Sequence, residues 1–190
     1  GGPGLADAGH NLYDLDGTLR LRDALGRFKG GRVAVLIAGL PFKCPAAPYE
    51  AAMLIEASLS RRGLREGTQV DVYTPETLPM PVAGRAMGEA VKGLVESRGV
   101  GFHPQHKVMA VDPERRELAF ENGARAGYDL LVVIPPHRCA PVVKEAGLTV
   151  EPGWAPVDKG TLQTAHERVF AIGDTTLIKL PVGLPLPKAG

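Results

Sequence analysis

The sequence predicts an α/β fold of the doubly wound, Rossmann-like type, and three observations carry this prediction. The nearly continuous apolar runs at 33–38 and 129–134 are typical of strands buried on both faces of a parallel sheet. Helical patterns follow the first two strands, which gives the alternation of a doubly wound domain. Between Lys107 and Gly127, short alternating runs with turn signals predict an antiparallel β-meander.

The elements follow in order from local patterns. Leu19, Ala24, Leu25 and Phe28 are spaced to share one face of a helix between 18 and 28, for which Asp16 or Thr18 is a candidate cap. Residues 9–13 are not expected to form a strand. The further expected elements are a strand at 33–38, a helix from about 47 to 62, a strand at 69–74, a helix from about 84 to 98, the meander, a strand at 129–134 and a short strand at 169–172.

Composition and length set the domain organisation. The chain has 190 residues, 44% of them hydrophobic, which suffices for one core or for one core plus part of a second. Its 24 glycines and 17 prolines are too many for an average domain and point to turns with special backbone geometry. We expect an N-terminal segment at 1–30, a complete middle domain at 31–146 and a Pro-rich C-terminal segment at 147–190.

Charge and cysteine usage exclude several classes of function. A formal net charge of +1 without a basic run argues against nucleic acid as a partner. The longest apolar run is far too short to cross a bilayer, and no signal peptide precedes it. Two cysteines cannot form a disulfide framework and fit a reducing, cytoplasmic compartment. The five histidines are scattered, with His137 standing alone, so we expect no metal site.

The turn after the first buried strand carries a cysteine where a dinucleotide-binding fold would carry its glycine fingerprint. Cys44 follows Lys43 and precedes a helix that Pro48 could open. A nearby ammonium group and a helix N-terminus both favour the thiolate, so Cys44 is a candidate nucleophile. The alternative is a small buried residue in a tight loop.

Cys139 lies five residues beyond the strand at 129–134. If that strand neighbours the first one, its loop opens on the same sheet edge as Cys44. A redox pair of the two cysteines is conceivable, but we favour a surface or packed thiol, because sequence does not constrain the distance between them.

The run from Asp14 to Leu19 resembles the nucleophile motif of haloacid-dehalogenase-type phosphatases, in which one carboxylate attacks phosphorus. We disfavour this function because the expected preceding strand is missing and the later acidic motif, at Asp174, is only half present. Asp14 and Asp16 are therefore interpreted as turn and cap residues.

Five stretches together resemble one family. They are residues 8–13, the Cys-Pro-Ala-Ala-Pro-Tyr-Glu turn within 41–50, Pro-Pro-His-Arg at 135–138, Val-Phe-Ala-Ile-Gly-Asp at 169–174 and Pro-Lys-Ala-Gly at 187–190. These stretches are similar to those of sulfide:quinone oxidoreductase-like flavoproteins, including flavocytochrome c sulfide dehydrogenases, within the pyridine nucleotide-disulfide oxidoreductase superfamily. The resemblance covers nearly the whole chain.

The resemblance implies the cofactor and the site residues. Cys44 matches the redox cysteine that carries sulfur as a persulfide beside the flavin of FAD, and Asp174 matches the carboxylate on the ribityl hydroxyls. Gly173 matches the residue that allows the close approach, and Lys188 matches a turn near the flavin ring. The segments 1–30 and 147–190 would then be parts of a flavin domain, and 31–146 a middle domain that keeps the NAD-binding fold.

The implied activity is oxidation of sulfide or a small thiol, with electrons passing through cysteine and flavin to a quinone or haem acceptor. The flavin fingerprint and the second redox cysteine of the family are absent, and Cys139 does not match the latter. The chain would thus be a fragment that neither holds FAD firmly nor turns over alone, while the full-length parent could contact the membrane peripherally. The alternatives are a flavin-dependent NAD(P)H dehydrogenase of the same superfamily and a non-catalytic interaction module.

Overall fold

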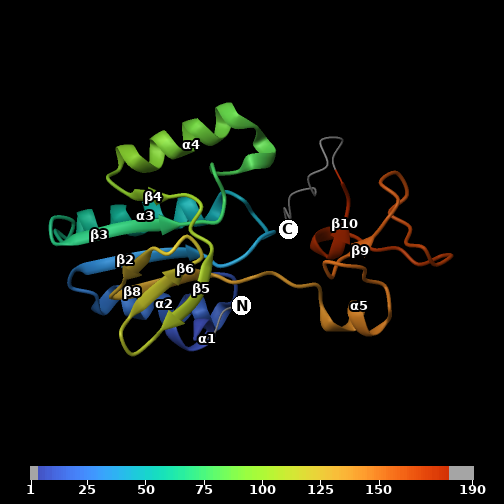
Figure 1. The fold of residues 1–190 in the computed structure, drawn as a ribbon, viewed down its shortest axis with the longest axis horizontal. Helices are drawn as coiled ribbons and strands as arrows, with labels where there is room; N and C mark the ends of the chain where they lie inside the picture. The colour runs from blue at the N-terminus through green and yellow to red at the C-terminus, as the bar shows by residue number, and fades with distance from the viewer. Residues whose placement is uncertain (1–3, 180–190) are drawn as a thin grey trace. The chain divides into compact units, whose positions relative to one another are not determined.

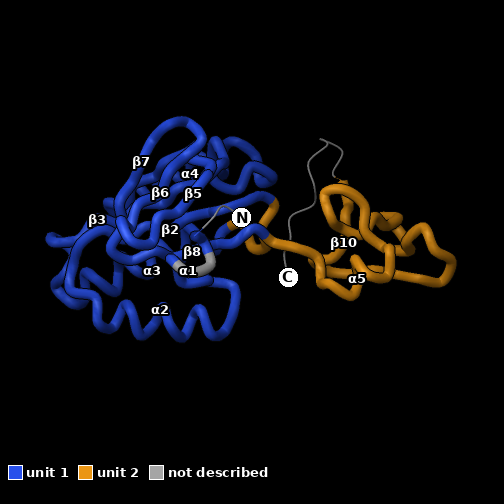
Figure 2. Tube along the Cα trace, turned by 60° about the horizontal axis from the view of Figure 1, so that its bottom comes forward, with its two compact units in different colours: residues 1–40, 46–136 blue, residues 41–45, 137–190 orange. Residues whose placement is uncertain are grey.

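A computed structural model describes residues 4–179, and the chain divides into two compact units (Figure 2). Unit 1 comprises Gly1–Leu40 and Ala46–Pro136. Unit 2 comprises Pro41–Pro45 and His137–Gly190, so a short turn of the early sequence belongs with the C-terminal region.

Unit 1 is built on a five-stranded sheet in the order β1-β8-β2-β3-β4, in which all neighbouring strands are parallel (Figure 1). A three-stranded antiparallel meander, β5-β6-β7, lies between β4 and β8 in the sequence. Its elements are α1 (Leu5–Ala8), β1 (His10–Asn11), α2 (Leu15–Arg27), β2 (Gly31–Ile37), α3 (Ala47–Arg61), β3 (Thr68–Tyr73), η1 (Pro81–Ala83), α4 (Arg85–Ser97), β4 (Gly101–His103), β5 (Val108–Asp112), β6 (Glu117–Phe120), β7 (Arg125–Gly127) and β8 (Leu130–Ile134). The expected α/β class, parallel sheet and meander are confirmed.

The central strands β2 and β8 are apolar because both of their faces are covered. Every residue of β8 is buried, as are the last five of β2, and the two strands pair in register from Val33↔Leu130 to Ile37↔Ile134. Side chains alternate between the faces of a strand, so each face receives half of this apolar run.

Helices cover one face of this sheet, and the meander covers the other (Figure 1). The cluster beneath the meander joins alternate residues of the sheet to residues of the meander and α1. Its buried members are Leu5, Ala34, Leu36, Tyr73, Val108, Val111, Leu118, Phe120, Tyr128, Leu131 and Val133. The meander thus takes the place that a helix would fill on this face.

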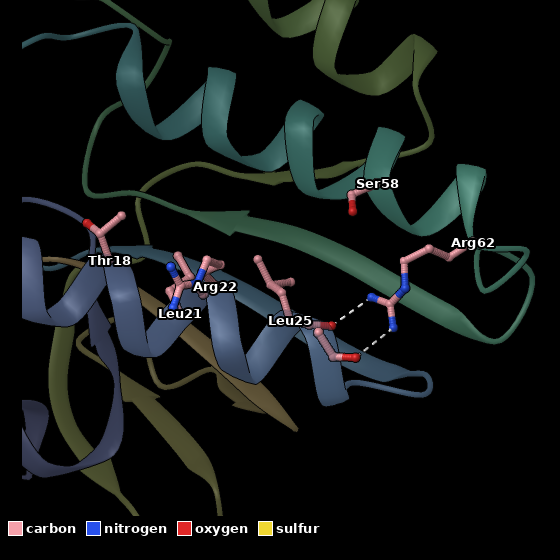
Figure 3. A pocket seen from close by; sticks show the side chains of 7 residues that line it. Thr18, Leu21, Arg22, Leu25, Ser58 and Arg62 are labelled. Carbon is pink, nitrogen blue, oxygen red and sulfur yellow. Dashed lines mark hydrogen bonds between the residues drawn. The ribbon is translucent and has the colours of Figure 1, made fainter.

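Helix α2 is fixed at both ends by polar contacts. Asp14 is its N-cap and accepts a hydrogen bond from the backbone N–H of Gly17. At the other end, the Arg62 guanidinium donates to the carbonyls of Leu25 and Gly26, at 2.6 and 3.3 Å (Figure 3). It also donates to the carbonyl of Phe28 at 2.8 Å, and so ties α2 to the end of α3. A cavity of about 400 Å³ between the two helices is lined by leucine, hydroxyl and arginine side chains.

Two sequence-based expectations about strands were wrong. His10–Asn11 forms β1, which pairs with Val132 and Val133 of β8, although no strand was expected there. Residues 169–172 form no strand: Phe170 makes an isolated bridge to Gln163, and the Phe170 side chain is exposed. In each case pairing, rather than local apolar content, decides whether a strand forms.

Unit 2 consists mainly of turns and short elements. These are α5 (Pro141–Glu145), β9 (Ala155–Pro156), η2 (Gly173–Thr175) and β10 (Thr176–Leu177). β10 runs parallel to β9, pairing Thr176 with Ala155. Trp154, which precedes β9, is buried and lies at the centre of this small unit.

Candidate functional site

The candidate site is formed by segments that follow the carboxyl ends of β2 and β8. The chain moves from β2 outward through β3 and β4 and then returns to the other side of β2 as β8, so the strand order reverses between β2 and β8. Loops that leave a parallel sheet at such a reversal are the usual source of binding residues. Here the β2 loop supplies Lys43 and Cys44, and the β8 loop supplies His137 and Cys139.

A glycine lets these two loops start close together. A Cβ atom on Gly39 would lie 3.0 Å from the side chain of Pro136, which is tighter than ordinary van der Waals contact. A larger residue at position 39 would therefore push the two loops apart where they leave the sheet.

Cys44 is exposed and has a left-handed backbone conformation, with φ of +52°. Few residues other than glycine adopt this region, and the strain is typical of functional turns. Cys44 stands three positions before the first residue of α3, and a proline occupies the first turn of that helix, as expected. The thiol is therefore available to a reactant from solvent.

The Cys44 turn is tied to the segment after β8 through a histidine. The backbone N–H of Lys43 donates to Nδ1 of His137 at 3.0 Å. Burial and the charge of Lys43 lower the pKa of His137 below its ordinary value, although Asp174 opposes the shift. The imidazole is therefore neutral near pH 7. The sequence suggested that His137 stands alone, but in the structure it contacts the Cys44 turn.

A second contact ties the same segment to η2. Sγ of Cys139 lies 2.7 Å from Oγ1 of Thr175, and either atom could donate the hydrogen. Thr175 directly follows Asp174, so the contact holds the short helical turn that carries this carboxylate. Cys139 is partly buried, which fits the packed thiol that we favoured.

These segments line one pocket of about 240 Å³ within unit 2. Its walls bring together basic, acidic, hydroxyl and thiol groups from three parts of the sequence. The lining residues are Lys43, His137, Arg138, Cys139, Ala140, Trp154, Asp174 and Thr175. Of the sequence-predicted site residues, Asp174 lies in the wall, Gly173 and Cys44 adjoin wall residues along the chain, and Lys188 lies outside the described residues.

The pocket is small, and its wall carries a carboxylate and a hydroxyl group. Its volume is below the range of about 300–1,000 Å³ that encloses a drug-sized ligand, so it suits a segment of a larger molecule. Asp174 supplies a half-buried carboxylate, and Thr175 a hydroxyl group, for a chain of ligand hydroxyls. Gly173 has φ of +69° and open space where a Cβ would lie, so a ligand can approach its backbone.

An acidic residue that follows β3 is engaged in a buried side-chain network. In dinucleotide-binding folds an acidic residue near the end of the second strand bonds the ribose hydroxyls. Glu76 follows β3 here, but it is 6% exposed and accepts hydrogen bonds from the hydroxyls of Tyr49 and Thr74. This carboxyl group is therefore turned inward and engaged with its own chain.

Sequence reasoning found Cys44 and Asp174 but missed the contact of His137 with the Lys43 backbone and that of Thr175 with Cys139. The available signal for His137 was that Pro135-Pro136-His137 directly follows a predicted strand. Within the described part of the chain, no group of three or more His, Cys, Asp or Glu residues is arranged to hold a metal ion. None of the helices formed by residues 4–179 is long and apolar enough to span a membrane.

Comparison with known proteins matches residues 31–186 to the family model described as pyridine nucleotide-disulphide oxidoreductase. The mitochondrial sulfide:quinone oxidoreductase of Mus musculus is 30% identical over 160 residues, which cover 80% of this chain and 35% of that protein. The corresponding protein of Dictyostelium discoideum is 28% identical over 171 residues, covering 86% of this chain and 37% of that protein. The chain thus spans about a third of the length of these curated relatives.

The fold is shared with a solved structure, the sulfide:quinone oxidoreductase of the hyperthermophilic bacterium Aquifex aeolicus. The TM-score is 0.77 with 19% sequence identity, and the match covers 94% of this chain and 44% of that one. At this identity the likeness establishes the Rossmann-like architecture.

Proposed function

Because this chain belongs to the pyridine nucleotide-disulphide oxidoreductase family, we propose that it forms part of an FAD-dependent enzyme of the sulfide:quinone oxidoreductase type. The enzyme would oxidise sulfide or a small thiol and pass the electrons to a quinone or haem acceptor. The names of the curated relatives support the sulfide and quinone parts of this proposal.

One observation carries the proposal. The turn with Cys44 and the short helix with Asp174 belong to the same compact unit, although most of the chain separates them in sequence. His137 bonds to the turn, and His137 and Asp174 line one pocket. The exposed thiol of Cys44 and the carboxylate of Asp174 thus belong to one compact unit, which supports the proposed roles of both.

In this proposal each residue has a distinct task. Cys44 receives the sulfur: joining HS⁻ to its thiol as a persulfide forms one S–S bond and releases one proton and two electrons. FAD, when bound, supplies the two-electron acceptor for this step. Asp174 would hold the cofactor through its carboxylate and Gly173 through close backbone approach, and the resemblance assigns the turn of Lys188 to the flavin ring.

The proposal extends to the organisation of the whole enzyme. In this proposal residues 31–146 correspond to its middle domain, and the segments 1–30 and 147–190 to parts of its flavin domain. The compact units of this chain are divided differently, since β1 and α2 belong to unit 1 and residues 137–146 to unit 2. Because a quinone dissolves in lipid, an enzyme using one as acceptor works at a membrane surface, which suits peripheral attachment on the cytoplasmic side. The inward-turned Glu76 favours this activity over the NAD(P)H-dependent alternative.

The test compares Cys44→Ser with Cys139→Ser in the complete flavoenzyme that carries this sequence. We expect Cys44→Ser to lower sulfide-dependent quinone reduction at least about a hundredfold, because serine is a poor nucleophile and cannot hold sulfur. Cys139→Ser retains a hydroxyl that can bond Thr175, so we expect a rate within about threefold of wild type. Flavin content is measured in both variants.

A wild-type sulfide rate in Cys44→Ser would remove Cys44 from the mechanism. A companion variant, Asp174→Asn, keeps the size of the side chain and removes its charge. We expect it to weaken FAD retention by about tenfold or more, since hydrogen bonds to a carboxylate are stronger than those to an amide. Full flavin retention in Asp174→Asn would instead contradict the cofactor role of this residue.

A further inference from the structure

A hydrogen bond links the proposed redox turn to a distant part of the sequence within unit 2. It runs from the backbone N–H of Lys43 to Nδ1 of His137, with an N···N distance of 3.0 Å. A ring nitrogen can accept a backbone N–H only through its lone pair, so the hydrogen of the neutral imidazole is on Nε2. The contact thus requires one particular protonation state of the ring.

The residue that follows Lys43 is under backbone strain. Cys44 has φ of +52°, in the left-handed region of the backbone. This conformation is strained for a residue with a Cβ and persists only where the surrounding structure holds it. Pro45 restricts the backbone on the C-terminal side of Cys44. On the N-terminal side, the hydrogen bond from the Lys43 N–H to His137 restrains the backbone. Loss of that hydrogen bond would weaken the support of the strained conformation on its N-terminal side.

We propose that His137, in its neutral form, is a positioning residue that holds the Cys44 turn in its reactive conformation. The inference rests on the proposed function, because it takes Cys44 as the residue that receives sulfur. His137 does not itself touch the reactant: it acts through the Lys43 amide. Protonation of the ring converts Nδ1 to a donor and breaks the contact, so the position of the turn depends on pH.

The charged groups around His137 set the direction of this dependence. Lys43 lies on the turn, Arg138 and Cys139 follow His137 in the pocket wall, and Asp174 faces it from η2. Burial and Lys43 lower the pKa of the ring from 6.5, while Asp174 acts in the opposite sense. A lowered pKa means that the contact is fully present above about pH 6.5 and is lost as the pH falls through the lowered value.

The test follows the Lys43 amide by NMR in the isotope-labelled chain, in wild type, His137→Asn and His137→Ala. In wild type we expect the amide resonance to titrate with a midpoint below 6.5. Asparagine places an oxygen near the position of Nδ1 and does not titrate, so the bond should persist without a pH step. In His137→Ala the Lys43 amide hydrogen should exchange about fivefold to tenfold faster, because the net contribution of one hydrogen bond is lost.

The second readout is the rate at which Cys44 reacts with dithiodipyridine, resolved from Cys139 by peptide mass. We expect His137→Ala to change this rate at pH 7 by at least about threefold, and His137→Asn to restore it. His166→Asn is the matched control, because His166 is an exposed histidine of the same unit, and this change should leave both readouts at their wild-type values.

A Lys43 amide that does not titrate in wild type, or a Cys44 rate that is equal in wild type and His137→Ala, would overturn the positioning role. Neither readout uses sulfide, flavin or acceptor. The positioning role of His137 is therefore tested independently of the activity of the complete enzyme. A sulfide activity that survives Cys44→Ser would refute the proposed function and leave the measured Lys43 contact untouched.

Discussion

Glu76 and His137 lie in different units, but burial shifts both toward their uncharged forms. Desolvation raises the pKa of Glu76, against the opposing hydrogen bonds from Tyr49 and Thr74. Desolvation likewise lowers the pKa of His137. An acid and a base therefore respond to the same physical cause with pKa shifts in opposite directions, although the hydrogen bonds that Glu76 accepts favour its charged form.

The shift at Glu76 predicts how stability changes with pH. A carboxyl group whose pKa is raised by folding contributes stability that is fully present below its unfolded value, 4.5, and is lost as the pH rises through the folded value. Glu76→Gln keeps an oxygen for the Tyr49 hydroxyl and cannot ionise. We expect the difference in melting temperature between the variant and wild type to grow in favour of the variant from about pH 4.5 to neutral pH.

The control is Tyr49→Phe, which removes a hydrogen bond that favours the charged form of Glu76. It should destabilise the chain by about 1–3 kcal/mol at neutral pH, because a buried carboxyl group is left with fewer donors. A pH-independent difference between Glu76→Gln and wild type would show that Glu76 does not titrate between the two states.

At the scale of elements, helix α2 offers a matched pair of aspartates. Asp14 is the N-cap and accepts the Gly17 amide, whereas Asp16 lies exposed in the first turn. We expect Asp14→Ala to lower the free energy of unfolding by about 1 kcal/mol through loss of the cap. Asp16→Ala should cost only about 0.3–0.5 kcal/mol through the helix dipole. Urea denaturation followed by circular dichroism measures both, and equal losses would contradict the assignment of the cap.

Sequence reasoning identified elements whose pattern is set locally. The strands β2 and β8 were predictable because both faces are buried, which leaves an uninterrupted apolar run. The cap candidates Asp16 and Thr18 were wrong, because both lie within α2 and the N-cap is Asp14, which the sequence indicated only as a turn or cap residue. Strand β1 was not predictable, because its two polar residues form a strand only through pairing with β8. For residues 169–172 the error was the opposite one: their apolar content predicts a strand, but none forms, and Ile172 is 72% exposed.

The same distinction applies to the candidate site. Cys44, Gly173 and Asp174 stand in short motifs that can be recognised one at a time. The partner contacts of His137 and Thr175 bridge 94 and 36 positions, and no local period or spacing encodes such separations. The Lys43–His137 contact follows from the crossover that places β8 beside β2. The Cys139–Thr175 contact depends on how the residues after β8 fold within unit 2.

At the scale of the whole molecule, the two units differ in how much apolar surface they bury. All of the largest fully buried side chains among the described residues belong to unit 1, including Tyr49, Leu36, Ile37 and Leu131. The described part of unit 2 buries Phe42 and Trp154 as its large side chains and otherwise consists mainly of turns. Local stability follows buried apolar contact, so the units should open with different free energies.

Amide hydrogen exchange on the chain alone, analysed by mass spectrometry, tests this difference. We expect the slowest exchange in β2 and β8, whose amides are both paired and buried. Peptides from 141–179 should exchange at least about a hundredfold faster, because opening unit 2 exposes far less apolar surface than opening unit 1. Peptides of α4 provide the internal reference, since this helix packs in unit 1 yet is largely exposed. If protection in 141–179 equalled that of β2, the two units would unfold as one cooperative body, and the small core around Trp154 would be stabilised by more than its own contacts.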